Sequence, residues 1–300
     1  MNSKYTLTIL LTLLLLNTHA QKNNPKVYMS LSEALQKPRE VELLNIRGQR
    51  LQSLSDSVGL CKNLVFLNLM KNQLTVLPSS MGKLTKLTEV VADQNMLTVL
   101  PEEMGNLKKL QHLQLKKNKL QQLPVSFKQL KQLQTLEISN NQFTSMPATI
   151  SSMKSLTSLN LSDNKIGQLP ANIGTLTKLL QLNVSSNNLT NLPNEIGRLK
   201  SLETLLLENN KLTEIPAETG NLSNLKTLIL TQNNLQGLPD CFEGLQKLET
   251  LILSYNQITE LPPSIHKLTQ LKTLALIGNP ITPARLEQLR KALPDTDIRF

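Results

Sequence analysis

The 300-residue sequence contains no tryptophan, and aromatic residues make up only 3% of it. A core of large aromatic rings is therefore excluded, and the interior must be built from leucine and other aliphatic side chains. Sites that stack single-stranded nucleic-acid bases need aromatic residues between the basic ones, and the sequence has no such pattern. We therefore expect no nucleic-acid partner.

Cysteine is also scarce, because only Cys61 and Cys241 occur. They fall seven repeats apart in the array described below. With repeats stacked at ~4.8 Å they would lie tens of ångströms apart, whereas a disulfide requires a Cα separation of ~4.4–6.8 Å. The sequence therefore excludes a disulfide framework, and we expect both cysteines to be buried thiols.

The sequence offers no recognisable catalytic or metal-binding constellation. Its three histidines, His19, His112 and His266, are too far apart to converge with a serine or cysteine nucleophile. No metal-ligand spacing or phosphate-cradling glycine loop occurs, and the acidic residues are scattered. We expect a non-enzymatic protein with no catalytic residues, no cofactor and no metal.

What the sequence does contain is a 23-residue repeat. Residues 176–198 read L-x-x-L-x-x-L-x-V-x-x-N-x-L-x-x-L-P-x-x-I-G-x, and the same pattern begins again at Leu199. Repeats begin at positions 38, 61, 84, 107, 130, 153, 176, 199, 222, 245 and 268. Ten asparagines recur at one position: Asn72, Asn95, Asn118, Asn141, Asn164, Asn187, Asn210, Asn233, Asn256 and Asn279. Such self-similarity at a fixed period is typical of a solenoid.

Each repeat position has a physical reason. Residues from Gln181 to Ser185 alternate apolar and polar, which predicts a strand, and strands from successive coils would form a parallel sheet. The asparagine follows each strand and can bond backbone groups at the turn, bridging neighbouring coils. Proline at positions such as Pro193 ends extended structure. Glycines such as Gly197 let the backbone turn towards the next strand.

The N-terminal segment has the pattern of an export signal. Lys4 precedes an apolar run from Thr8 to Leu16, which is followed by the small-residue cleavage site at Thr18–Ala20. The run is too short to span a bilayer, which takes ~20 apolar residues. We expect cleavage after Ala20, with an uncleaved anchor as the alternative.

The segments on either side of the repeats are predicted to form caps. Residues 21–37 form a polar linker and then a capping helix, because Ser30 and Glu33 make a capping box. Residues 38–282 hold ten full repeats and a truncated eleventh. In residues 283–300, Pro283 starts a helix with one apolar face and Pro294 stops it, and Ile298 and Phe300 alternate as a closing strand. Both caps would cover the open ends of the array.

The chain carries a formal net charge of +10, mostly from lysine. Lysines recur between the apolar positions of successive repeats, as expected for a solvated flank. A track that binds a polyanion is the alternative interpretation.

Residues that alternate away from the core are the candidates for binding. The N-terminal third presents Phe66, Met70, Lys71, Val91, Met96, His112, Lys116 and Lys117, and the middle presents Thr135, Ser139, Asn160, Ser162, Asn183 and Ser185. The C-terminal third presents Leu206, Ile229, Ile252, Tyr255, Ala275 and Ile277, beside a regular column of threonines. We predict that Leu206, Ile229, Ile252, Tyr255, Ala275, Ile277, Phe66 and Met70 bind a partner. A purely structural ladder of strand-forming residues is the alternative.

Residues 38–282 resemble the leucine-rich repeat superfamily. Their L-P-x-x-(I/M/F)-G-x-L spacing is similar to the spacing in the repeats of the animal Ras-pathway scaffold and of the plant intracellular Ras-group proteins. The segment from Val27 to Leu35 and the C-terminal Ile298–Phe300 resemble the ends of exported Bacteroidetes-type repeat proteins. The resemblance implies an α/β fold, a right-handed horseshoe with a parallel concave sheet, short helical caps and a protein-binding function.

We therefore expect a secreted or periplasmic monomer that binds a protein partner on its concave face, with no membrane span. One alternative is a cytoplasmic signalling scaffold of the Ras-group kind. Another is a surface adhesin for envelope polysaccharide, for which Tyr255 and Phe66 are the only exposed aromatic candidates.

Overall fold

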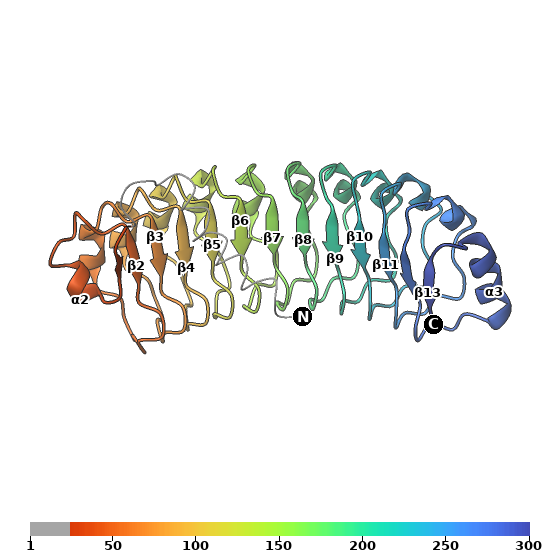
Figure 1. The fold of residues 1–300 in the computed structure, drawn as a ribbon, viewed down its shortest axis with the longest axis horizontal. Helices are drawn as coiled ribbons and strands as arrows, with labels where there is room; N and C mark the ends of the chain where they lie inside the picture. Colours follow the sequence, from red (N-terminus) through yellow and green to blue (C-terminus); the bar gives the residue numbers. More distant parts are fainter. Residues whose placement is uncertain (1–24) are drawn as a thin grey trace.

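One short strand from each of the eleven repeats, with one more from each cap, builds a thirteen-stranded parallel sheet in the computed structural model, which describes residues 25–300 (Figure 1). The strands are β1 (Val27–Tyr28), β2 (Leu43–Asn45), β3 (Phe66–Asn68), β4 (Glu89–Val91), β5 (His112–Gln114), β6 (Thr135–Glu137), β7 (Ser158–Asn160), β8 (Gln181–Asn183), β9 (Thr204–Leu206), β10 (Thr227–Ile229), β11 (Thr250–Ile252), β12 (Thr273–Ala275) and β13 (Asp297–Arg299). They lie side by side in sequence order. The predicted solenoid with a parallel sheet is confirmed.

The strands are shorter than the alternating pattern predicts. Strand β8 ends at Asn183, whereas the alternation continues to Ser185. The reason is the backbone at Ser186, which has φ 54° and lies in the left-handed region, so the chain leaves the strand direction. The ladder nevertheless continues beyond the strand, because the Val184 amide donates to the Leu206 carbonyl at 2.9 Å.

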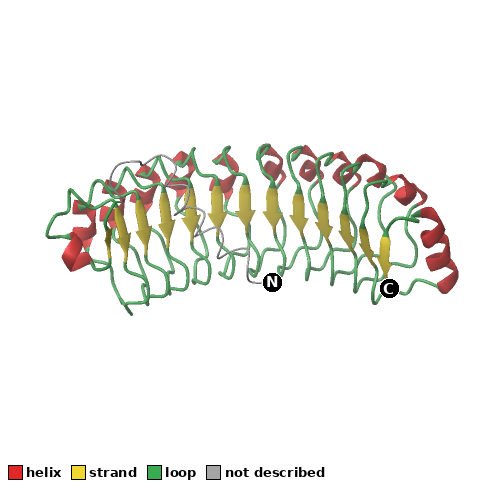
Figure 2. Ribbon diagram, in the orientation of Figure 1, coloured by secondary structure: helices red, strands yellow, loops and turns green. Residues whose placement is uncertain are grey.

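Short 3-10 helices return the chain along the convex side of the arch (Figure 2). They are η2 (Asp56–Leu60), η3 (Ser79–Lys83), η4 (Glu102–Asn106), η5 (Val125–Gln129), η6 (Ala148–Ser152), η7 (Ala171–Thr175), η8 (Asn194–Arg198), η9 (Ala217–Asn221), η10 (Phe242–Gly244) and η11 (Pro263–Lys267). Most begin directly after the repeat proline, as η8 does after Pro193. Proline suits this place because its fixed φ leads into the helix and its missing N–H is not needed.

The repeat glycines have a different role from the one predicted. The backbone of Gly197 does not adopt a positive φ, so no left-handed turn requires glycine there. Instead, a Cβ atom at Gly197 would lie 2.3 Å from the Glu218 carbonyl oxygen of the next coil, and one at Gly174 would lie 2.6 Å from that of Glu195. Glycine is therefore required because neighbouring coils approach closely on the convex side.

The asparagine column bridges neighbouring coils, as predicted. The Asn164 side-chain oxygen accepts from the Phe143 amide of the preceding coil at 3.1 Å. Its NH₂ group donates to the Leu161 carbonyl of its own coil at 3.0 Å and to the Ile138 carbonyl of the preceding coil at 3.1 Å. The asparagine thus bonds backbone groups that the turn leaves without ladder partners.

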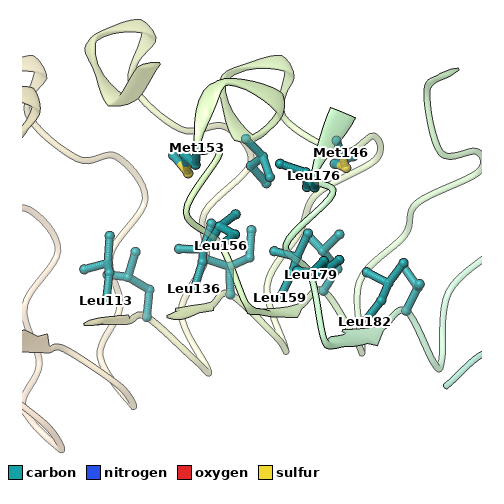
Figure 3. Close-up of a cluster of buried hydrophobic side chains, with 14 of the residues drawn as sticks. Leu113, Leu136, Met146, Met153, Leu156, Leu159, Leu176, Leu179 and Leu182 are labelled. Carbon is teal, nitrogen blue, oxygen red and sulfur yellow. The ribbon is translucent and has the colours of Figure 1, made fainter. Parts of the chain in front are cut away.

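The core is a continuous stack of aliphatic side chains (Figure 3). Leucines from the centres of successive strands form one column: Leu113, Leu136, Leu159 and Leu182, each at most 1% exposed. A buried leucine contributes roughly 1.5–3 kcal/mol relative to an exposed one. Because each side chain is covered by neighbours in the coils before and after it, no coil has a core of its own.

Both cysteines are free thiols. Cys61 is buried within the core and Cys241 is half-buried beside η10. No disulfide joins them, as predicted. Burial raises the pKa of the Cys61 thiol, so the group is an apolar core residue rather than a nucleophile.

The N-terminal end is covered by β1 and α2 (Leu31–Ala34). The Ser30 hydroxyl accepts from the Glu33 amide at 3.2 Å and caps the helix. The Glu33 carboxylate does not reach back to the cap, because it pairs with Lys26 at 2.7 Å. The predicted export signal, residues 1–20, lies outside the described residues.

The C-terminal end is covered by α3 (Pro283–Ala292) and β13. The Thr282 hydroxyl accepts from the Arg285 amide at 3.4 Å, with Pro283 in the first turn. Leu289 and Leu293 are buried against the last coil, and β13 pairs with β12.

Candidate binding surface

Each coil presents three outward positions on the concave face. In the coil of β11 these are Thr250, Ile252 and Ser254, and the next residue, Tyr255, has the left-handed backbone. The alternating residues Leu251 and Leu253 are fully buried. Because residues 23 apart pair across the sheet, equivalent positions form rows along the arch.

The apolar row, which we define as Leu206, Ile229, Ile252 and Ala275, is continuous. Leu206 pairs with Ile229, Ile229 with Ile252, and Ile252 with Ala275. The first three side chains are half-buried. Ala275 is only 6% exposed, because its short side chain lies between Ile252 and Arg299 of β13. The row therefore offers three accessible side chains rather than the four that were expected.

Tyr255 and Ile277 border the apolar row and are more exposed. Their exposed fractions are 57% and 42%. The Tyr255 ring lies over Gly278, where a Cβ atom would be 2.6 Å from the ring carbon Cδ1. Glycine at position 278 therefore leaves room for the ring to lie against the next coil.

Threonines and charged pairs border the apolar row on its other side. Thr204, Thr227, Thr250 and Thr273 pair in register, as the sequence predicts. The residues just before them form ion pairs between coils, Lys226 with Glu203 at 2.9 Å and Lys272 with Glu249 at 2.8 Å. The apolar row thus has a polar rim, which is the anatomy of many protein interfaces.

Phe66 and Met70 do not join this surface. Both are half-buried residues of the β3 coil, eight strand positions from β11. At ~4.8 Å per strand the separation along the sheet is about 38 Å. The predicted site residues therefore form two groups, of which only the C-terminal one is contiguous.

The middle of the concave face is less open than expected. Ser139, Ser162 and Ser185 were expected to face solvent, but their exposed fractions are 1%, 7% and 4%. The short hydroxyl side chains at this third outward position are covered by their neighbours, whereas the longer Lys116 and Ile277 at the same repeat position are exposed. A larger side chain there would disturb packing, so these serines are unsuitable as solvent-exposed controls for substitutions such as Ser→Asp.

The structure also brings together a group of ionisable residues, of which the outward residues predicted from the sequence include only Lys116. Asp93 and Lys116 are 23 residues apart and adjacent on the concave face, and Glu137 stands on the next coil. Burial raises the pKa of Glu137 to about 7, with a further contribution from the Asp93 charge. Burial also raises the pKa of Asp93 to about 6. The repeat register was the signal that could have found this group, because it places the three residues on neighbouring coils.

Two further features of the described range, residues 25–300, limit the chemistry of the surface. No group of three or more histidine, cysteine, aspartate or glutamate side chains is placed to hold a metal ion. None of the helices in that range is long and apolar enough to cross a membrane.

Two family profiles match the chain. One, described as leucine rich repeat, matches residues 154–212, 200–258 and 223–281. The other, described as a leucine-rich repeat region, matches residues 92–165. No curated protein sequence is significantly similar to this chain.

Solved structures with the same architecture come from bacteria and plants. A Leptospira interrogans leucine-rich repeat protein is 29% identical, with 92% of this chain and 100% of that chain aligned at a TM-score of 0.52. A Listeria monocytogenes internalin is 22% identical, covers 89% and 82%, and shares the fold at a TM-score of 0.70.

A plant receptor ectodomain is also similar. The ectodomain of the Arabidopsis thaliana membrane receptor kinase GASSHO1/SCHENGEN3, solved in complex with CASPARIAN STRIP INTEGRITY FACTOR 2, is 30% identical at a TM-score of 0.65. The alignment covers 86% of this chain and 34% of that one, so this chain spans about a third of the receptor ectodomain.

Proposed function

This chain is a leucine-rich repeat protein, and from that premise we propose that it is a non-enzymatic module that binds a protein partner on its concave face. We further propose that it acts after export, in the secreted or periplasmic space. The support for export is the signal-like pattern of residues 1–20.

The observation that carries the proposal is the apolar row with Tyr255 and Ile277 beside it. Half-buried Leu206, Ile229 and Ile252 sit in register on three adjacent strands, and Tyr255 is more than half exposed. Exposed apolar patches with polar rims often mark contacts, and tyrosine is a favoured central residue in interfaces. A strip of three to four coils at ~4.8 Å spans roughly 15–20 Å, about one contact patch.

A protein partner fits this surface better than a polysaccharide does. Sugar binding would require aromatic platforms, and the two candidates, Tyr255 and Phe66, stand on coils eight strand positions apart. The plant receptor ectodomain solved with a bound factor is a further parallel for a protein or peptide ligand. A cytoplasmic scaffold of the Ras-group kind remains the rival, and it requires that the N-terminal segment is neither cleaved nor exported.

The test uses affinity capture of the partner from the native host with the mature chain, residues 21–300. Ile252→Asp combined with Tyr255→Ala should weaken capture by roughly tenfold or more. The melting temperature should change little, because both side chains face outward.

The matched control is Asn183→Asp combined with Ser186→Ala. Asn183 occupies the position equivalent to Ile252, and Ser186 occupies the left-handed position equivalent to Tyr255. This pair should leave capture unchanged. Loss of capture with the control pair, while the Ile252/Tyr255 pair still binds, would show that the apolar row is only a structural ladder.

A further inference from the structure

The carboxylates of Asp93 and Glu137 share the N-terminal half of the concave face, on either side of the β5 coil. Gln114 and Lys116 of that coil separate them, and the Asp93 charge is close enough to act on Glu137. Neither carboxylate forms an ion pair with any residue of the range 25–300, although nine ion pairs form elsewhere in that range. The Lys116 charge acts on both carboxylates without forming an ion pair, so a single cation serves two acids in a chain whose net charge is +10.

Each carboxylate is held by one oxygen only. Asp93 Oδ1 accepts from the Lys116 backbone amide at 2.7 Å, and Glu137 Oε2 accepts from Asn160 Nδ2 at 2.9 Å. Asp93 Oδ2 and Glu137 Oε1 accept no hydrogen bond from the described part of the chain. One hydrogen bond therefore fixes the position of each carboxylate, while its second oxygen stays available to a hydrogen-bond donor from a ligand.

Two buried polar side chains nearby also have no partner. The Ser139 hydroxyl, two residues after Glu137 on an outward position, is 1% exposed and forms no hydrogen bond with the residues that the structure describes. Glu89 stands on the outward first position of β4, two outward positions before Asp93, and is 8% exposed. Its carboxylate accepts no hydrogen bond and makes no ion pair within residues 25–300, and its neighbours across the sheet are Phe66 and His112.

Such an arrangement destabilises the free protein, because one hydrogen bond on each carboxylate and the shared Lys116 charge compensate only part of the solvation that the two groups lose. A ligand that supplies positive charge and several hydrogen-bond donors would remove this cost. A bare metal ion does not fit, since the acids of the described range are too dispersed to form a metal site. An anion would be repelled. A guanidinium group offers five donors spread over a planar fork and can reach acceptors on separate coils, whereas an ammonium group is a compact point charge.

We propose that Asp93 and Glu137, with the unpaired Glu89 beside them, bind a basic side chain, preferentially arginine, from an extended segment of a protein ligand. This site goes beyond the proposed function, because its nearest residue, Glu137 on β6, lies three strand positions from Leu206 on β9, and the site stands whether or not the apolar row binds a partner. It also assigns a role to residues that the core does not need.

The electrostatics give the site a defined pH dependence. On the neighbouring coils, the residues at the position of Asp93 are Met70 and Lys116. The residues at the position of Glu137 are Gln114 and Asn160. Lys116 is therefore the only charged side chain among these four neighbours. Burial raises the pKa of Asp93 to about 6 and that of Glu137 to about 7. Only the deprotonated carboxylates attract a cation, so binding strengthens as the pH rises through this range and weakens below it. A bound cation in turn lowers the pKa values of both carboxyl groups.

The experiment titrates the full chain with a neutral-ended tripeptide, acetyl-Gly-Arg-Gly-amide, and with its uncharged citrulline analogue. Nuclear magnetic resonance follows the side-chain carboxyl signals of Asp93 and Glu137. The arginine peptide should shift both signals and lower both pKa values, and it should bind more tightly at pH 7.5 than at pH 5.5. The citrulline peptide should leave both carboxyl signals and both pKa values unchanged, and it should show no such difference in binding between the two pH values.

The decisive variant is Asp93→Asn combined with Glu137→Gln, which should weaken arginine-peptide binding by roughly tenfold or more. Asp163→Asn combined with Glu208→Gln is the matched control, because these exposed acids lie on the same face and the change in net charge is identical. The Ile252→Asp and Tyr255→Ala pair should bind the peptide normally. The proposal is overturned if the control weakens binding equally, if citrulline binds as well as arginine, or if neither carboxyl pKa moves with the peptide present.

Discussion

Two adjacent residues at the end of each strand determine how the coil turns. The first adopts a left-handed backbone, with φ between 52° and 58° at positions such as Asp163 and Asn209, and left-handed conformation costs an L-residue roughly 1–2 kcal/mol. The Asp163 amide donates to the Ser185 carbonyl of the next coil at 2.9 Å, and the following residue, Asn164, bonds three backbone carbonyls and one amide. These bonds, worth about 1 kcal/mol each, offset the strain.

Replacing Asn164 by leucine tests this account. Asn164→Leu should lower the free energy of unfolding by roughly 1–3 kcal/mol, because the buried backbone groups that it serves lose their partner. Ser162→Ala is the comparison, since its hydroxyl bonds only the exposed Asp163 carboxylate at 3.1 Å. Denaturant midpoints of the two variants check the result, and equal small shifts would contradict the structural role of the asparagine column.

The elements at the two ends of the array serve a purpose that no internal coil needs. An internal strand has partners on both sides, whereas β2 and β12 would be edges without β1 and β13. Exposed strand edges promote intermolecular pairing, and an uncovered last coil also exposes its leucines. Leu289 of the helix α3 and Leu293, which caps its C-terminus, cover that coil.

Deleting residues 283–300 should therefore convert the protein into an aggregating species. The truncation removes α3 and β13, which exposes Leu274, Leu276 and the free edge of β12. Size-exclusion chromatography and thermal melting measure the outcome. A monomeric truncated protein with an unchanged melting temperature would show that these residues do not act as a cap.

At the scale of the whole molecule, the concave face is divided in two. The N-terminal half carries the ionisable group around Asp93 and Glu137, and the C-terminal half carries the apolar row with Tyr255. The solenoid allows this division because each coil contacts only its neighbours, so outward residues can vary along the array without disturbing the core. A partner that spans both halves would contact acidic side chains at one end and apolar side chains at the other.

Export is the prediction that concerns the entire chain. Cleavage after Ala20 should leave a mature protein that begins at Gln21, because the apolar run of residues 8–16 ends in a small-residue site. Intact-mass measurement of the protein from separated fractions of the native host checks this. Detection of only the full-length chain, in the cytoplasm, would contradict the exported function.

The repeat by itself determined the architecture. The 23-residue period, the alternation around Gln181 and Leu182, and the recurring asparagine identify each coil, its strand and its turn, since these depend on local sequence and translation along one axis. For the same reason the sequence predicts which residues are neighbours across the sheet, such as Ile229 and Ile252.

Exposure and electrostatics were decided only by the tertiary structure. Ser139 and Ala275 are outward by alternation yet buried, and Gly197 is required by the approach of another coil rather than by its own backbone. Likewise, the raised pKa values of Asp93 and Glu137 arise from desolvation by surrounding coils. Periodicity specifies the direction of each side chain, but burial depends on how closely the neighbouring coils pack around it, and that is a property of the assembled solenoid.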